Sequence, residues 1–134
     1  MTPKELQHRF HYMFPDKNLG YGFAHGWFPG FVSLCESIDV LLGPDKRKFH
    51  WTQLKEKMGS GRYHFAIQSR EPIVDSGLLA RIRKLIENAE AQTLDMCIYC
   101  GEPGALHNHK GYLSVRCDLH RKLAESGNNE SPWL

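Results

Sequence analysis

Apolar side chains recur every three or four residues in three stretches of the chain, the spacing that places them on one face of a helix. These stretches predict helices over residues 2–13, 27–42 and 75–94, and the second is the most apolar, so we expect it at the centre of the core. Thr2, Pro3 and Glu5 form a capping pattern at the start of the first helix. The apolar stripes consist of Leu6, Phe10 and Met13; of Trp27, Phe31, Leu34, Ile38 and Leu41; and of Leu78, Ile82, Leu85 and Ala89.

Between the second and third helices the period changes to two, which is typical of a β-strand. Residues 49–58 and 62–67 flank Gly59-Ser60-Gly61, so this region predicts an antiparallel hairpin with a short glycine turn. In the second strand, alternate residues are apolar from Tyr63 to Ile67. In the first strand, Trp51 and Leu54 are out of phase with each other.

Composition narrows the class of protein without naming a function. The chain has 134 residues, 41% of them hydrophobic, which suits a globular protein with one main core. The net charge of +2 is too small to indicate a general nucleic-acid-binding surface. No apolar run approaches the roughly 18 residues of a membrane span, and no signal-peptide pattern is present, so we expect a cytoplasmic protein.

Four residues near the C-terminus form a metal-binding pattern. Cys97 and Cys100 belong to a CxxCG knuckle, and Cys117 and His120 form a second pair further along the chain. Three thiolates and one imidazole are a common ligand set for structural zinc. We therefore predict one Zn²⁺ ion held by these four residues. The remaining cysteine, Cys35, lies in the apolar second helix and is expected to be buried.

Two further histidines, His107 and His109, lie between the two halves of the motif. Three interpretations are open: they are surface residues of a polar turn, one of them replaces His120 as the fourth ligand, or one of them is a catalytic base. Outside this region the sequence has no phosphate-binding loop, dinucleotide fingerprint or nucleophile elbow.

These elements predict an α+β fold, with helices packed on a small antiparallel hairpin and a zinc-knuckle or ribbon-like subdomain at the C-terminus. We expect the core to span residues 1–95 and the zinc-binding subdomain residues 96–125, with a short hairpin before Cys117 and a short helix after His120. Residues 126–132 contain no large apolar side chain, and residues 126–134 are expected to form a flexible tail.

Basic residues form two groups that could contact a nucleic acid or another partner. Lys46, Arg47 and Lys48 are consecutive, and the predicted hairpin tip carries a second group, consisting of Lys55, Lys57 and Arg62. Both groups can equally be solvated surface.

The order of motifs resembles a family of small uncharacterised proteins of phages, prophages and bacteria. The resemblance rests on Gly26-Trp27 before a helix, a "KEKFG"-type hairpin at residues 53–65, and a CxxCGxPG and RCDxH pair at residues 97–120. It implies the fold described above and a phage or mobile-element origin, and it assigns no catalytic residue.

A weaker resemblance is to HNH nucleases of the recombination endonuclease VII type, which share the order of CxxCG, histidine pair and second ligand pair. It implies a metal-dependent DNA nuclease with His107 or His109 as the base. This chain has Leu106 where that group has an acidic metal ligand, and Arg121 where it has an asparagine.

We therefore expect a non-enzymatic, zinc-stabilised protein that binds a host protein or protein complex, for example as an inhibitor of host defence. The alternatives are a metal-dependent nuclease and a nucleic-acid-binding protein without enzymatic activity.

Overall fold

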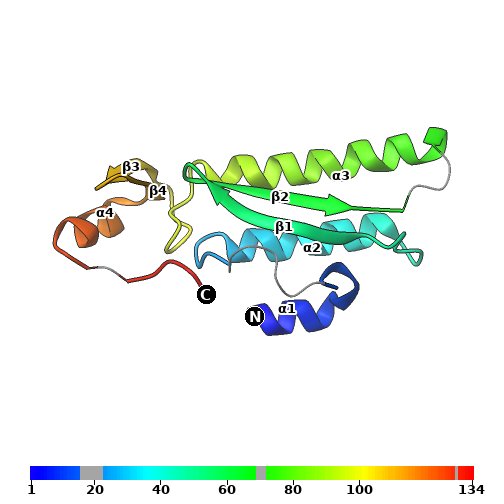
Figure 1. The fold of residues 1–134 in the computed structure, drawn as a ribbon, viewed down its shortest axis with the longest axis horizontal. Helices are drawn as coiled ribbons and strands as arrows, with labels where there is room; N and C mark the ends of the chain where they lie inside the picture. The colour runs from blue at the N-terminus through cyan, green and yellow to red at the C-terminus, as the bar shows by residue number, and fades with distance from the viewer. Residues whose placement is uncertain (16–22, 69–71, 129) are drawn as a thin grey trace.

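The computed structural model describes residues 1–15, 23–68, 72–128 and 130–134. It is an α+β fold with two separate antiparallel hairpins, as the sequence predicts (Figure 1). The helices are α1 (Pro3–Arg9), the 3-10 helix η1 (His11–Met13), α2 (Phe28–Leu42), α3 (Pro72–Thr93) and α4 (Asp118–Glu125). The strands are β1 (His50–Lys57), β2 (Ser60–Ala66), β3 (Ala105–His109) and β4 (Tyr112–Arg116).

The predicted cap of the first helix is present, because Thr2 Oγ1 accepts a hydrogen bond from the Glu5 backbone N–H at 3.2 Å. The helix is shorter than predicted: α1 ends at Arg9, and the remaining residues to Met13 form the tighter η1.

The hairpin of β1 and β2 explains the irregular spacing of Trp51 and Leu54. The register shifts at Thr52, where β1 carries one extra residue. This bulge turns Trp51 and Leu54 to the same face, and both are buried, at 0% and 3% exposure. The turn also differs from the prediction. It consists of Met58 and Gly59, both with positive φ, and Ser60 and Gly61 belong to β2.

Helix α3 begins three residues before Asp75, the position at which the sequence suggested a cap. It runs beside β2 (Figure 1) and covers the hydrogen-bonding edge of that strand with two side chains. Glu90 accepts from the Tyr63 N–H at 2.9 Å, and Thr93 Oγ1 accepts from the Gly61 N–H at 2.8 Å. These bonds satisfy backbone donors at a strand edge that would otherwise be open to pairing.

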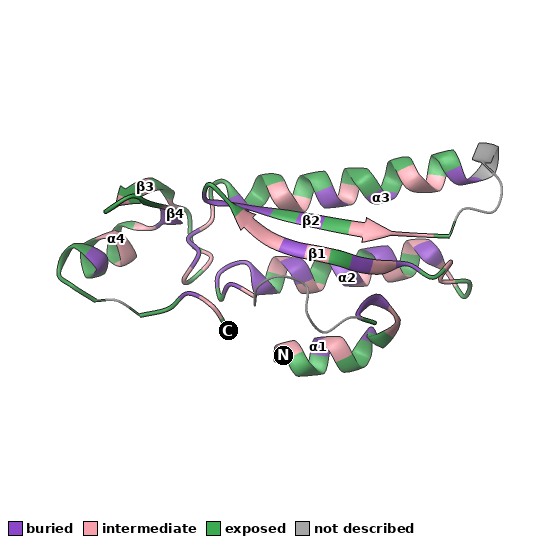
Figure 2. Ribbon diagram, viewed as in Figure 1, coloured by how far each residue is buried: buried purple, intermediate pink, exposed green. Residues whose placement is uncertain are grey.

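The main core lies where α2, α3, β1 and β2 meet, together with α1 and η1 (Figure 2). Its centre is aromatic. Phe31 of α2 contacts Trp51 and Tyr63, with ring centroids 5.2 and 5.1 Å away. Cys35 is fully buried beside them, as expected.

The second hairpin and α4 lie beyond the tip of the first hairpin, at one end of the molecule (Figure 1). We expected residues 126–134 to form a flexible tail, but the structure places the last of them against the start of α2. The backbones of Ala24 and Trp133 form a β-bridge, and the Trp133 and Trp27 rings meet edge to face with centroids 6.4 Å apart. Trp133, the second-last residue, supplies the apolar contact that the polar sequence before it lacks.

Candidate functional site

The structure brings together the four residues that the sequence predicted as metal ligands. One ligand atom from each of Cys97, Cys100, Cys117 and His120 lies within 4.8 Å of the other three. The Cys100 and Cys117 sulfurs are 3.8 Å apart, and His120 Nδ1 is 3.5 Å from the Cys97 sulfur and 3.1 Å from the Cys117 sulfur. This group can hold one metal ion.

The first two ligands lie on a tight turn between α3 and β3. The Gly101 N–H donates to the Cys97 carbonyl, and the Cys97 N–H donates to the Glu102 carbonyl, both at 2.8 Å. Gly101 has a φ of +81°, a conformation that glycine adopts without strain. The chain therefore folds back after Cys100, so that both sulfurs point to the same side.

The second pair lies at the start of α4, which begins at Asp118, three residues earlier than the helix that we predicted after His120. Cys117 is the N-cap, and its sulfur accepts from the His120 backbone N–H at 3.5 Å. The first helical turn then brings the His120 imidazole to the same sulfur. The sequence pattern identified the four residues that come together but missed the cysteine as a helix cap, because Cys is not among the usual capping residues.

The clustered thiols affect one another electrostatically. Burial works against the Cys97 thiolate, but backbone N–H groups of Cys117, Tyr99 and Cys100 outweigh it and hold the pKa of Cys97 below its ordinary value. Partial desolvation, and then the neighbouring sulfurs of Cys97 and Cys117, raise the pKa of Cys100 to about 11. Two thiolates side by side therefore repel each other, and a cation between them removes that repulsion.

The turn that carries Cys97 is anchored to the core through Gly26, which precedes α2. The Gly26 N–H donates to the Ile98 carbonyl at 2.8 Å, and a β-carbon at Gly26 would lie only 1.9 Å from the Cys97 carbonyl oxygen. Ile98 is fully buried against Ala24 and Trp27 in a second small apolar cluster. The sequence predicted Gly26-Trp27 as a helix start. It gave no sign of the anchoring role of Gly26, because that role depends on a contact with Ile98, which is distant in the chain.

Two residues beside the ligands were not singled out by the sequence. The Tyr99 ring stacks on the His120 imidazole, with centroids 5.0 Å apart and planes 9° from parallel. The Arg116 guanidinium lies 5.3 Å from the centroid of the Tyr99 ring. Tyr99 therefore fixes the orientation of the His120 ring, which is how a residue next to a ligand supports a metal site.

The structure places His107 and His109 on β3, one strand away from the ligands. They point to the same side, toward α4, and are not part of the four-residue group. In the part of the chain that the structure describes, that group is the single set of three or more His, Cys, Asp or Glu side chains close enough to share a metal. Among the described residues, therefore, no second group of metal-binding side chains lies beside His107 and His109, as a metal-dependent nuclease would require.

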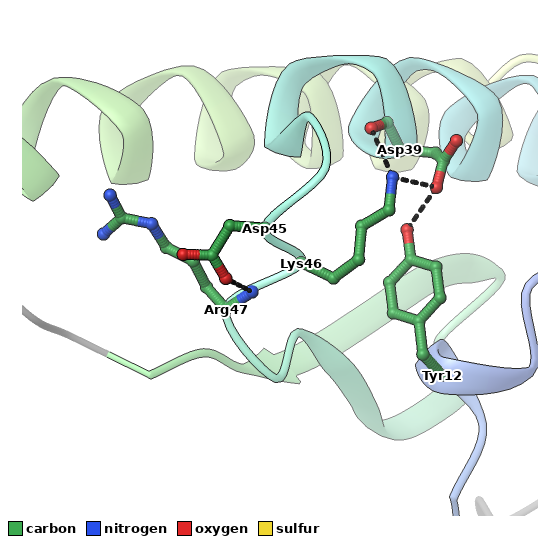
Figure 3. A network of polar contacts seen from close by, with 5 residues as sticks. All are labelled: Tyr12, Asp39, Asp45, Lys46 and Arg47. Carbon is green, nitrogen blue, oxygen red and sulfur yellow. Dashed lines mark hydrogen bonds and ion pairs between the residues drawn. The ribbon is translucent and has the colours of Figure 1, made fainter.

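Two of the three residues in the first predicted basic group form ion pairs within the protein (Figure 3). Lys46 forms an ion pair with Asp39 at 2.9 Å, and Asp39 also accepts from the Tyr12 hydroxyl at 2.5 Å. Arg47 forms an ion pair with the buried carboxylate of Asp75. Lys48 is exposed.

The second basic group shares one face of the first hairpin. Lys55 and Arg62 are directly paired across the strands, and Lys57 follows Lys55 on the same side. Lys48 precedes the start of β1 and Lys57 ends it, so the length of that strand, about 25 Å, separates the two groups. They do not form one patch, and their contact with a partner stays a prediction.

Comparison of the chain with protein-family models, with curated proteins and with solved structures gives no match. Among the described residues, no helix has both the length and the apolar character needed to cross a membrane.

Proposed function

We propose that this chain is a zinc-stabilised binding protein without enzymatic activity, and that its partner is a protein. Zinc holds the C-terminal subdomain, and a groove between α2 and α3 receives an acidic amphipathic segment of the partner. The groove is the observation that carries the binding role.

The spacing of the four ligand atoms supports zinc as the metal. In a tetrahedral site with zinc–sulfur bonds of about 2.3 Å and zinc–nitrogen bonds of about 2.0 Å, two sulfurs lie about 3.8 Å apart, and a sulfur and a nitrogen about 3.5 Å apart. The distances of 3.8 Å between Cys100 and Cys117, and 3.5 Å between Cys97 and His120, match these edges, whereas the 3.1 Å between Cys117 and His120 is shorter than the expected sulfur–nitrogen edge. Four protein ligands leave no open position, which is the arrangement of a structural site.

The groove has a volume of about 660 Å³. Its apolar lining includes Val40 and Leu41 of α2 and Leu85 of α3. Val40 is 81% exposed, although it lies on the most apolar helix of the chain. An exposed apolar groove between two helices is a surface that an amphipathic helix of another protein can cover.

The charges at the rim of the groove indicate the sign of the charge on the partner segment. Arg81 and Lys84 of α3 are exposed, and within the described residues neither has a carboxylate within 4.0 Å. On the α2 side, Glu36 is paired with Arg9 at 3.2 Å. The rim is therefore net positive, and acidic residues flanking the apolar positions of a partner segment complement it.

The resemblance to small phage and prophage proteins supports a mobile-element origin. On that basis the partner belongs to a host protein complex in the bacterial cytoplasm, and inhibition of a host defence system is one form that the binding takes. A nucleic-acid partner would instead use the exposed basic face of the first hairpin.

Two groove variants and one matched control test this proposal. Val40→Asp places a charge at an exposed apolar position of the groove lining, and the double variant Arg81→Glu/Lys84→Glu reverses the charge of the rim. Lys55→Glu/Arg62→Glu makes the same charge change on the hairpin. Proteins enriched from bacterial lysate by the wild type are compared with those enriched by each variant, and the affinity of the purified partner is then measured by calorimetry.

The proposal predicts that one partner loses affinity by about tenfold or more with both groove variants and is unaffected by the hairpin variant. A partner that both groove variants bind normally would show that the groove is not the binding surface. A nucleic acid that the hairpin variant alone fails to bind would favour the nucleic-acid alternative.

A further inference from the structure

A small cavity between β3 and α4 collects basic side chains that the metal site does not use. Its volume is about 60 Å³, several times the roughly 10–15 Å³ that one water molecule needs. The cavity can therefore hold a group of a few heavy atoms. The charged and titratable residues of its lining are His107, His109, Arg116, Arg121 and Glu125.

The register of the second hairpin explains why these residues meet. Ala105 pairs with Arg116 and His107 pairs with Ser114, so these four side chains share one face. His109 follows His107 on that face by the period of two. Helix α4 covers the same face and adds Arg121 and Glu125.

Arg116 is the unusual member of this group, because its side chain is buried and has no acidic partner. The residue is 7% exposed, and its Nε–H donates to Ser114 Oγ at 2.7 Å. Within the described part of the chain, no carboxylate lies within 4.0 Å of the guanidinium. One face of the guanidinium lies against the Tyr99 ring, 5.3 Å from its centroid, and the N–H donors at its edge that do not reach Ser114 are available to an anion.

Arg121 has acidic partners, which limits its role. It forms ion pairs with Glu125 at 3.0 Å and with Asp118 at 4.0 Å, and both carboxylates are exposed. Glu125 lies at the cavity itself, so it competes with any anion that enters. Arg116 is therefore the main anchor, and Arg121 contributes when an anion takes the place of the Glu125 carboxylate.

We propose that this cavity binds a phosphate group, held by Arg116 and contacted by His107, His109 and Arg121. The planar guanidinium matches the oxygen geometry of phosphate, and a neutral imidazole offers one further N–H donor. The size of the cavity admits the phosphate and leaves the rest of a larger ligand outside. This site is separate from the α2–α3 groove, so neither proposal depends on the other.

The test is a titration of the zinc-loaded full chain with inorganic phosphate, with chloride adjusted to keep the ionic strength constant. Side-chain NMR signals of His107 and His109 report binding. The variants are Arg116→Gln, which removes the anchor, and Glu125→Gln, which removes the competing carboxylate. Arg62→Gln on the first hairpin is the matched control. Zinc content is measured for each variant, so that damage to the metal site is seen directly.

We expect saturable shifts of both histidine signals with phosphate and none with chloride. Arg116→Gln should weaken binding by about tenfold or more, Glu125→Gln should strengthen it, and Arg62→Gln should leave it unchanged. If Arg116→Gln also loses zinc, its weaker binding could come from damage to the metal site. The gain of affinity in Glu125→Gln then tests whether the cavity binds phosphate. An absence of saturable shifts, or affinities that do not respond to the Glu125 substitution, would overturn the proposal.

The same titration with an oligonucleotide, with and without a 5′-phosphate, identifies the source of the group. Tighter binding of the phosphorylated form would show that the cavity takes a terminal phosphate of a nucleic acid. Equal binding of inorganic phosphate and of the phosphorylated oligonucleotide would show that the phosphate alone is recognised.

Discussion

Substitution of Gly26 by alanine should separate the metal-binding turn from the core. A β-carbon at this position would lie 1.9 Å from the Cys97 carbonyl oxygen, 2.7 Å from the Gly101 nitrogen and 2.9 Å from the Ile98 carbonyl carbon. All three are backbone atoms, so no side-chain rotation relieves the overlap. The turn must retreat by about 1 Å to reach the 3.0 Å that real contacts keep.

The expected loss of stability has two parts. Overpacking of this kind destabilises a protein by about 1–3 kcal/mol. The retreat also breaks the hydrogen bond from the Gly26 N–H to the Ile98 carbonyl, which contributes about 1 kcal/mol. We therefore expect Gly26→Ala to lower the free energy of unfolding by about 2–4 kcal/mol. Because the same turn presents Cys97, metal affinity should fall by about tenfold or more.

The assay is urea unfolding of the metal-loaded protein, followed by circular dichroism, with metal affinity measured against a competing chelator. Gly77→Ala is the matched control, because a β-carbon at that helical position meets nothing within 4 Å. It should stabilise the protein by about 0.5–1 kcal/mol, as alanine does in a helix. A Gly26→Ala protein with wild-type stability and wild-type metal affinity would refute the anchoring role of Gly26.

Three further predictions follow from the contacts described above. The pKa of Asp39 is held below its ordinary value by the hydrogen bond from Tyr12 and then by Lys46, so its contribution to stability is complete above about pH 4 and is lost as the pH falls through its folded value. The stability difference between the wild type and Asp39→Asn, measured by urea unfolding, should therefore shrink in acid; a constant difference down to about pH 2 would contradict this. Thr93→Val leaves the Gly61 N–H without its acceptor and should cost about 1–3 kcal/mol in the same assay, whereas an unchanged midpoint would show that the bond contributes nothing. Removal of the metal with a chelator should increase hydrogen exchange throughout β3, β4 and α4 while the amides of α2 stay protected, and equal protection with and without metal would contradict a structural role for the ion.

Much of the fold follows from local patterns. The spacing of apolar residues predicted three helices and the first hairpin because each pattern reports which side of an element is buried. The exceptions depend on contacts that are distant in sequence. The bulge at Thr52 became visible only through pairing with β2, and the tail is held by Trp133 against Trp27.

The group of candidate metal ligands could be predicted because ligand spacing is part of the chemistry, with two residues between the members of each pair. The surroundings of the site could not be predicted in this way. Burial of Arg116 depends on which face of β4 the helix covers, and the ion pairs of Lys46 and Arg47 involve Asp39 and Asp75 in other elements. A run of basic residues shows the charge available and leaves open how much of it is already paired.

We propose that one zinc ion is held by Cys97, Cys100, Cys117 and His120. Native mass spectrometry combined with elemental analysis of the purified chain tests it most directly. We expect one zinc per chain in the wild type and in the double variant His107→Gln/His109→Gln, and loss of the ion in Cys117→Ser. A wild-type protein that carries no metal, or a Cys117→Ser protein that retains a full equivalent of zinc, would contradict it.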